Sequence, residues 1–495
     1  MCRPSLVVAG EHMKLALVGV GDAGTRIVDH FVRREQATGR SITAGNILVF
    51  NTDDRAFEDT REISEERQVL LGETHSAVKR RPNSTDVSVS AEDNGDADRV
   101  HTGTHTDIID SYGVGGNPDV GATVAEAELP EIRRALDQID ETEVAATMLV
   151  VGLGGGTGSG VGSVLLEELN AIHETPVYVL GVLPSTTEPD HRALTAARGI
   201  RTLVPLADAT FAVDNEAWRH STDSVAARHN EINEGIVTRL LAVFGAGERD
   251  PEATSEMRVD SADLSRTLEI GGVTTIGYAT HELNCDDNNL FARLLRLLSL
   301  SNDTDDNGAD AATIKRLIRQ ALESKLTLPC AVDSADRVLL ILSGPPNTIS
   351  RKGFETGRYL LEEETTTVEV LAGDEPVSGA TEITATVVLS NVTDIPRIDE
   401  IQRQAVATQP LSSLDDHDTA AGRDSDVDGD GREDEVDPDR VLTDDTAGGA
   451  GDGSVGEDDD AEVDDAAKSN AADSSVEAVD GETNHSFDFD VERDE

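Results

Sequence analysis

Short apolar runs alternate with amphipathic stretches along the first half of the chain. The runs have the length of buried strands, and the stretches between them, such as Gly24–Arg34 and Pro130–Ile139, place apolar residues at helical spacing. This β-α-β-α order predicts an α/β fold, in which a mostly parallel, Rossmann-like sheet is covered by helices on both faces. The predicted strands are Leu15–Val18, Ile47–Phe50, Met148–Val151, Val177–Val182 and Ala209–Val213.

A long helical segment at Ile232–Phe244 separates this half from a different pattern. The apolar runs that follow are shorter, which favours a second, α+β domain with a smaller, mixed sheet. These runs are Gly272–Tyr278, Arg337–Ser343, Thr367–Leu371 and Glu382–Leu389.

Three segments lie outside the strand and helix patterns. Residues 79–111 are polar and have no period, which predicts an inserted surface loop. Residues 411–495 carry 31 acidic and 5 basic residues and almost no large apolar ones. Because such a segment cannot bury enough surface to offset its ordering entropy, we expect a disordered acidic C-terminal tail. Residues 1–12 precede the first strand-like element, which Met13 opens, and are interpreted as an N-terminal extension.

Composition limits the partners and the compartment. The chain has 495 residues, with 97 Asp and Glu against 41 Lys and Arg, and a net charge of −56. This charge argues against nucleic acid or an anionic membrane as a direct partner, and it suits a protein that stays hydrated in concentrated salt. Cys2, Cys285 and Cys330 lie far apart, so neither a disulfide framework nor a zinc site is expected. No apolar stretch approaches the ~20 residues that span a bilayer, and a cytoplasmic protein is expected.

The tail contains one pattern that resembles a metal site. Asp426–Gly431 has the D-x-D-x-D-G spacing of a calcium loop. An EF-hand would have flanking helices and usually Glu at its last position, whereas here Asp437 is followed by Pro438 and both flanks are polar. A solvated run of acidic residues is therefore the favoured interpretation.

The first sequence with phosphate-binding character is Gly19-Val-Gly21-Asp-Ala-Gly24, directly after the first predicted strand. Glycines here allow a tight turn and a close approach to phosphate, while the helix that follows offers unpaired N–H groups. By itself the pattern fits a dinucleotide site, in which Asn51-Thr-Asp53 would supply the ribose-binding acid. An NAD(P)-dependent oxidoreductase is thus one reading of this motif.

A second glycine-rich loop decides against a dinucleotide site. The sequence from Gly152 to Gly160 follows the strand Met148–Val151, and two phosphate loops on neighbouring strand ends exceed what one dinucleotide unit uses. The loop has no Lys, so it is not a Walker-type loop, and backbone N–H groups with the Thr157 hydroxyl would hold the phosphates. A flexible linker or tight helix packing is the structural alternative, which the regularity and position of the run disfavour.

Several segments resemble the tubulin/FtsZ superfamily, in the same order along the chain. Residues 154–160 (GGGTGSG) match its signature loop, and residues 113–121 (GVGGNPDVG) resemble the loop that wraps the terminal phosphate. Glu188 and Arg192 stand at the family's E-x-x-x-R positions near the ribose. The resemblance implies that GTP is bound by Gly21, Asp22, Ala23, Gly24, Thr25, Arg26, Gly116, Asn117, Gly155, Gly156, Thr157, Gly158, Glu188 and Arg192, with Asn215 and Asn233 facing the sugar and the base.

Residues 259–264 (VDSADL) resemble the family's synergy loop, whose acidic residues complete the active site of the neighbouring subunit. Phosphoryl transfer needs an oriented water, and a carboxylate can orient that water and accept its proton. The resemblance implies this catalytic role for Asp263 first and Asp260 second, which would tie hydrolysis to polymerisation. A solvated acidic turn that caps a helix is the structural alternative.

Within the superfamily, the chain is most similar to the archaeal CetZ proteins over about residues 13–410. Residues 178–184 (YVLGVLP) and 214–218 (DNEAW) are among the CetZ-like segments. Thr25, Pro189 and Asp263 depart from the residues that many members carry at these positions. The resemblance implies a GTP-binding domain at 13–235, a central helix with its connection at 236–259, and a C-terminal activation domain at 260–405.

The function implied by the resemblance is that of a cytoskeletal GTPase in a halophilic archaeon. Such a protein polymerises head to tail with copies of itself and controls cell shape. Mg²⁺ would bridge the β- and γ-phosphates without a dedicated metal site of protein carboxylates, because Mg²⁺ keeps most of its waters. The alternatives are a division-ring FtsZ and a GTP-binding regulator with weak hydrolysis. The acidic tail would bind protein partners.

Overall fold

The computed structural model describes residues 13–80, 112–218, 225–246, 259–283, 311–324, 326–346, 348–349, 351–365 and 369–408. All of them belong to one compact unit, Met1–Ala421. The predicted N-terminal extension, nearly all of the polar insertion, and the acidic tail with its calcium-loop pattern lie outside these residues.

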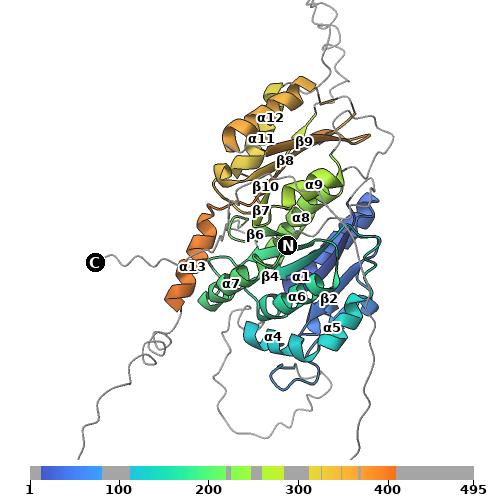
Figure 1. The fold of residues 1–495 in the computed structure, drawn as a ribbon, viewed down its shortest axis with the longest axis vertical. Coiled ribbons are helices and arrows are strands. Elements are labelled where there is room, and N and C mark those ends of the chain that lie inside the picture. The colour runs from blue at the N-terminus through green and yellow to red at the C-terminus, as the bar shows by residue number, and fades with distance from the viewer. Residues whose placement is uncertain are drawn as a thin grey trace, which may run out of the picture. The chain divides into compact units, whose positions relative to one another are not determined.

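The strands of the described residues form one ten-stranded sheet in the order β3-β2-β1-β4-β5-β6-β7-β10-β8-β9 (Figure 1). Each strand predicted from the apolar runs is present, and β3 is an additional short one. The bounds are β1 Leu15–Val20, β2 Ile47–Asn51, β3 Gln68–Leu70, β4 Ala146–Gly152, β5 Val177–Leu183, β6 Ala209–Asp214, β7 Val273–Glu282, β8 Arg337–Gly344, β9 Glu369–Pro376 and β10 Glu382–Ser390.

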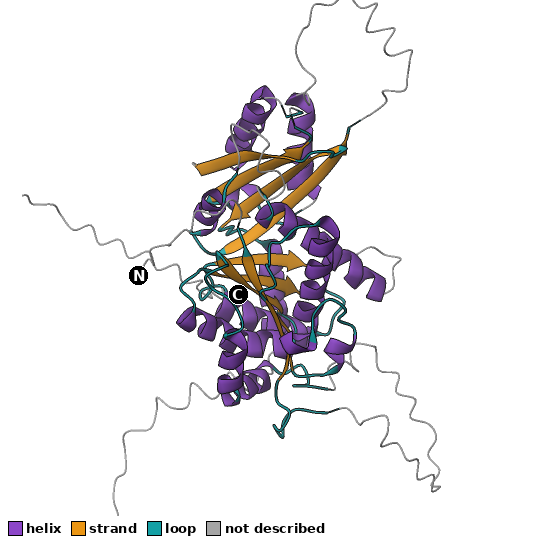
Figure 2. Cartoon of the chain, turned by 90° about the vertical axis from the view of Figure 1, so that its right-hand side faces the viewer, coloured by secondary structure: helices purple, strands orange, loops and turns teal. Residues whose placement is uncertain are grey.

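Helices connect most of these strands (Figure 2). They are α1 Gly21–Thr38, α2 Arg55–Glu58, α4 Pro118–Ala127, α5 Leu129–Leu136, α6 Gly162–Ile172, α7 Asp190–Leu203, α8 Val225–Phe244, α9 Ser261–Leu268, α11 Ala311–Ser324, α12 Arg351–Thr365 and α13 Pro396–Thr408. A π-helical turn, η2 Thr157–Val161, leads into α6, and short 3-10 turns lie at η1 Glu65–Arg67 and η3 Val332–Ser334. No helix in the described part of the chain is long and apolar enough to cross a membrane.

Parallel pairing runs from β3 through β6, so the carboxyl ends of these strands meet at one edge of the sheet. β7 continues in the same direction through two residue pairs, Thr210 with Val273 and Phe211 with Thr274. Beyond it, β10 is antiparallel to β7 and to β8, while β8 and β9 are parallel. The predicted α/β fold and the mixed sheet of the second half are confirmed, and the two sheets are continuous.

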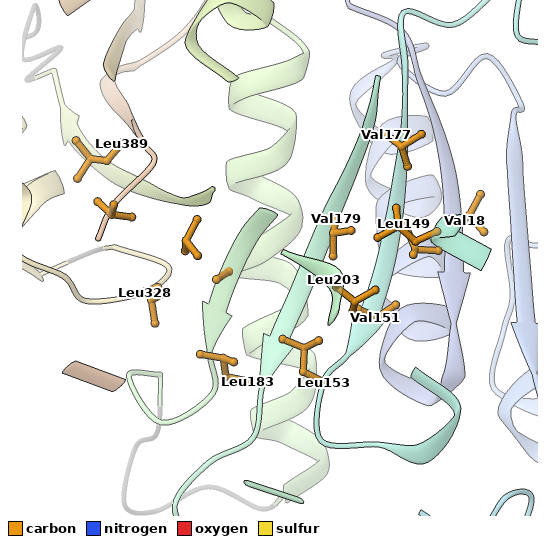
Figure 3. Packing of buried hydrophobic residues seen from close by; sticks show 14 of the residues in the cluster. Val18, Leu149, Val151, Leu153, Val177, Val179, Leu183, Leu203, Leu328 and Leu389 are labelled. Carbon is orange, nitrogen blue, oxygen red and sulfur yellow. The ribbon is translucent and has the colours of Figure 1, made fainter. Parts of the chain in front are cut away.

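Both faces of the sheet are buried, because alternate strand residues enter two different cores. Val18, Leu149 and Val179 belong to one core, which α4 to α7 and α11 to α13 complete (Figure 3). Leu17 and Met148 directly precede Val18 and Leu149 in their strands, and they belong to the other core. Helices α1, α8 and α9 contribute to this core. The result is a three-layer arrangement that fixes the loops at the strand ends.

Two predicted helices begin earlier than the sequence indicated, α1 at Gly21 and α8 at Val225. Glycine is a poor helix former, but burial of α1 side chains such as Ile27 and Phe31 outweighs that preference. The sequence pattern did not predict α12, which contains Gly353 and Gly357. A Cβ at Gly357 would lie 2.7 Å from Cδ1 of Ile318 in α11, so this glycine allows the two helices to pack closely.

Candidate functional site

The loops that follow β1, β4, β5 and β6 meet at the carboxyl edge of the parallel strands. Three of them lead directly into helical turns, namely α1, η2 and α7. The first N–H groups of a helix lack intrahelical acceptors, and the helix dipole makes this end positive. This edge of the sheet therefore suits an anion such as a phosphate chain.

The first glycine loop and the GGGTGSG loop are in direct contact. Gly21 has φ +70°, and a Cβ there would lie 3.2 Å from the Gly158 nitrogen and 3.4 Å from Cβ of Thr157. A Cβ at Gly24 would overlap the Val150 carbonyl oxygen, so Gly24 is needed for close packing of α1 on β4. Thr25 is fully buried, and its Oγ1 has no hydrogen-bond partner in the structure. The partly exposed residues of this loop are Asp22, Ala23 and Arg26.

The end of β2 orients side chains of both glycine loops. The Asn51 amide donates to Oδ1 of Asp22 at 3.1 Å, and its own Oδ1 accepts from the backbone N–H of Thr52 at 2.8 Å. The hydroxyls of Thr52 and Thr157 are hydrogen-bonded at 2.8 Å. Asn51 thus positions the carboxylate of Asp22 in the first loop. The sequence analysis named Thr52 only as part of the segment Asn51-Thr-Asp53 and did not predict its contact with the GGGTGSG loop.

The third glycine loop packs on the same structure. Gly113, Gly115 and Gly116 have φ of +60°, +63° and +72°, values that favour glycine. A Cβ at Gly156 would lie 2.5 Å from the backbone nitrogen of Asn117, so the third loop and the GGGTGSG loop touch through their backbones. Oδ1 of Asn117 accepts from the N–H groups of residues 119 and 120 at 2.9 and 3.4 Å, which caps α4 and directs its N-terminus at this edge.

Glu188 and Arg192 form an ion pair at 3.1 Å at the start of α7, with side chains 24% and 17% exposed. The other oxygen of Glu188 accepts from the backbone N–H of Ser185 at 2.7 Å. Asn215 lies in the turn after β6, where its backbone N–H donates to the Leu183 carbonyl at 3.3 Å. Asn233 is buried on α8. Glu188, Arg192 and Asn215 therefore flank the glycine loops at the carboxyl edge.

Asp260 and Asp263 cap α9. Oδ1 of Asp260 accepts from the Asp263 N–H at 2.9 Å, and Oδ2 of Asp263 accepts from the Asp260 N–H at 3.3 Å. This capping box is the structural alternative weighed above, and it is present. Burial is the main cause that raises the pKa of the Asp263 carboxyl, and the Asp260 charge raises it further.

The capped end of α9 lies at the edge of the sheet opposite the glycine loops. Ser265 of α9 is hydrogen-bonded to Tyr178, the second residue of β5, whereas the Glu188 loop follows the last residue of that strand. A seven-residue strand spans roughly 20 Å. Asp260 and Asp263 therefore do not reach the glycine loops of their own chain.

The described residues contain no cluster of three or more His, Cys, Asp or Glu side chains that could hold a metal ion. Trp218 and Cys330 have packing roles. Trp218 stacks with the Arg239 guanidinium at 4.4 Å from the ring centroid. Burial raises the pKa of the Cys330 thiol to about 12, so this thiol stays protonated.

Substitution of Gly158 by Ala tests the packing of the GGGTGSG loop against the end of β4. We expect the free energy of unfolding to fall by about 2–3 kcal/mol, because the new methyl group would overlap the Gly152 carbonyl oxygen. Gly155→Ala is the matched control, since the nearest atom would lie 3.7 Å from its Cβ. Urea unfolding without nucleotide measures both, and equal losses of stability would contradict the packing described here.

The joined sheet and the interlocked glycine loops define a GTPase domain of the tubulin/FtsZ type. The model of the Tubulin/FtsZ family GTPase domain matches residues 14–223, and that of the tubulin-like CetZ C-terminal domain matches residues 222–407. The chain belongs to the tubulin-like CetZ family, which confirms the resemblance inferred from its motifs.

Individual relatives agree with this assignment. Tubulin-like protein CetZ1 of Haloferax volcanii is 37% identical over 401 residues, which cover 80% of this chain and 93% of that protein. The structure of a GDP-bound CetZ1 monomer is 34% identical with a TM-score of 0.63, covering 80% of this chain and 100% of that one. A GTPγS-bound protofilament of CetZ2 from the same organism is 27% identical with a TM-score of 0.62, covering 82% of this chain and 100% of that one.

Proposed function

We propose that this chain binds GTP at the carboxyl edge of its parallel sheet. The phosphates lie against the N-terminal turns of α1, η2 and α4, the ribose lies beside Glu188 and Arg192, and Asn215 and Asn233 face the sugar and the base. Gly24 and Thr25 are buried, and they support this site through packing rather than through contact with the nucleotide. The GDP and GTPγS present in the similar CetZ structures support this proposal.

Mg²⁺ fits the same proposal. Oxygen donors on Asp22 and Thr157 are of the type that Mg²⁺ prefers, and an ion that keeps most of its waters needs no cluster of protein carboxylates. Asp22 and Thr157 would hold such an ion, which would supply neutralisation of the charge that develops on the phosphates. The chain itself supplies backbone N–H groups and helix dipoles, which hold the phosphates without a Walker-type lysine.

We infer further that hydrolysis takes place between two copies of the chain. The observation that carries this inference is the separation of Asp260 and Asp263 from the glycine loops, which lie at opposite edges of the sheet. Stacking copies head to tail brings the α9 end of one copy to the nucleotide of the next. Asp263 then orients the attacking water and accepts its proton. The protofilament of CetZ2 supports this arrangement.

The resulting polymer would act as a cytoskeletal filament that controls cell shape in the cytoplasm, with the acidic residues 411–495 available to protein partners. A second candidate is a GTP-binding regulator with weak hydrolysis, which the mutual hydrogen bonds of Asp260 and Asp263 favour. Sedimentation in concentrated KCl tests the first function: we expect polymer with GTPγS and none with GDP. Purified protein that retains NAD in place of a guanine nucleotide would contradict both.

The pH dependence of turnover identifies the base. Asp263 must be ionised to accept a proton, so turnover falls as the pH falls through its pKa, which burial holds above the usual aspartate range. Asp260→Asn keeps a capping oxygen and removes a charge that raises this pKa. We therefore expect the acidic limb of the rate profile to move to lower pH in this variant. Loss of all turnover would instead indicate that Asp260 is the base.

A further inference from the structure

A buried arginine of α13 contacts the two loops on the ribose side of the site. Nη2 of Arg397 donates to the Pro184 carbonyl at 2.6 Å, and Nε donates to Oδ1 of Asp214 at 3.3 Å. The third nitrogen, Nη1, bonds to Glu400 of the same helix at 2.6 Å. The side chains of Arg397 and Asp214 are only 7% and 5% exposed. One guanidinium thus joins α13 to the ends of β5 and β6.

Both contacts lie directly beside residues of the proposed nucleotide site. Pro184 begins the loop that leads to Glu188, and Asp214 precedes Asn215. A second link joins the same two loops, because a Glu216 oxygen accepts from the Thr186 N–H at 3.0 Å. The distance between the β5 and β6 loops is therefore set by a small polar network, and Arg397 is its buried cation.

The electrostatics explain why an arginine is needed. Burial raises the pKa of Asp214, while the Arg397 charge opposes that shift. A buried carboxylate that loses its cationic partner is strongly disfavoured. Lys cannot replace this contact fully, because a single ammonium group does not reproduce the planar fork that binds a carbonyl and a carboxylate together.

We propose that Arg397 is a positioning residue for ribose recognition, holding the loops of Glu188 and Asn215 at the separation that the sugar requires. This inference rests on the proposed function, since it assumes that a guanine nucleotide binds at this edge. Arg397 acts through Pro184 and Asp214 and does not itself touch the nucleotide.

The test compares the affinities for GTP and for 2′,3′-dideoxy-GTP, which lacks the ribose hydroxyls. The native chain should prefer GTP. Arg397→Ala should weaken GTP binding by about tenfold or more, as expected for a lost charged hydrogen bond, and should bring the ratio of the two affinities toward one. Arg397→Lys should give intermediate values, and Arg403→Ala, an exposed arginine of the same helix, should leave both affinities unchanged.

A purely structural role gives a different result. If Arg397→Ala lowers the melting temperature but leaves the ratio of affinities intact, or if the native chain does not distinguish the two nucleotides, the inference is wrong. If Arg397→Ala does not fold, the ratio in Arg397→Lys decides in the same way. A native chain that binds no GTP overturns the proposed function, and this inference with it.

Discussion

GTP turnover in the Asp263→Asn variant should fall by at least ~100-fold, as expected when a positioned general base is removed. Asparagine keeps an oxygen that can accept the Asp260 N–H, so the cap of α9 is preserved and the loss reflects the missing charge. GTP affinity should not change, because Asp263 lies at the edge of the sheet opposite the glycine loops. Steady-state turnover and equilibrium GTP binding measure the two quantities separately.

Glu269→Gln is the matched control for this variant. Glu269 follows the last residue of α9, and its side chain is 71% exposed. Its substitution removes one negative charge from the same helix and should leave turnover unchanged. If Asp263→Asn retains native turnover in concentrated salt, the catalytic role of Asp263 is excluded, and the regulator with weak hydrolysis becomes the favoured function.

Arg40→Ala should lower the free energy of unfolding by about 3–5 kcal/mol, the usual cost of leaving one member of a buried ion pair uncompensated. Nη2 of Arg40 lies 3.4 Å from Oε1 of Glu375 in β9, and the two side chains are 7% and 5% exposed. Nη1 donates to the Leu241 carbonyl of α8 at 2.9 Å. The pair therefore ties the end of α1 and the central helix to the second half of the sheet. Urea unfolding measures the loss.

Two comparisons show how much of the expected loss of stability is due to the burial of this ion pair. Arg34 and Glu234 form an exposed pair at 3.5 Å, so Arg34→Ala should change stability by no more than ~1 kcal/mol. The double variant Arg40→Met/Glu375→Leu should recover most of the stability, because apolar residues of similar volume can replace a buried pair. Equal effects of Arg40→Ala and Arg34→Ala would show that the buried pair does not link the halves.

The strands and the glycine loops were predictable because their signals are local. A buried strand is a short apolar run, and a phosphate loop is a run of glycines directly after it. The order of these elements along the chain indicated the fold, and the resemblance of particular segments, such as residues 154–160, indicated the family. The sequence could not indicate which glycines are needed for packing. Gly21 and Gly24 belong to the same motif, and only the structure shows that the Val150 carbonyl lies beside Gly24.

The missed features depend on contacts between residues that are distant in the sequence. Arg397 and Asp214 are separated by 183 positions, and the segment 214–218 that contains Asp214 carries no sign of its buried partner. The continuity of the sheet rests on two residue pairs between β6 and β7, for which no local pattern exists. The helix cap that the sequence analysis weighed for Asp260 and Asp263 is present, and the catalytic role of these residues stays a prediction.

GTP turnover per subunit as a function of protein concentration tests most directly whether the active site is shared between copies. The assay should be run in concentrated KCl with saturating GTP, with light scattering recorded alongside it. A shared site predicts turnover near zero at concentrations that give no scattering, and a steep rise in turnover per subunit once polymer forms. Constant turnover per subunit down to the monomer range would contradict hydrolysis between subunits.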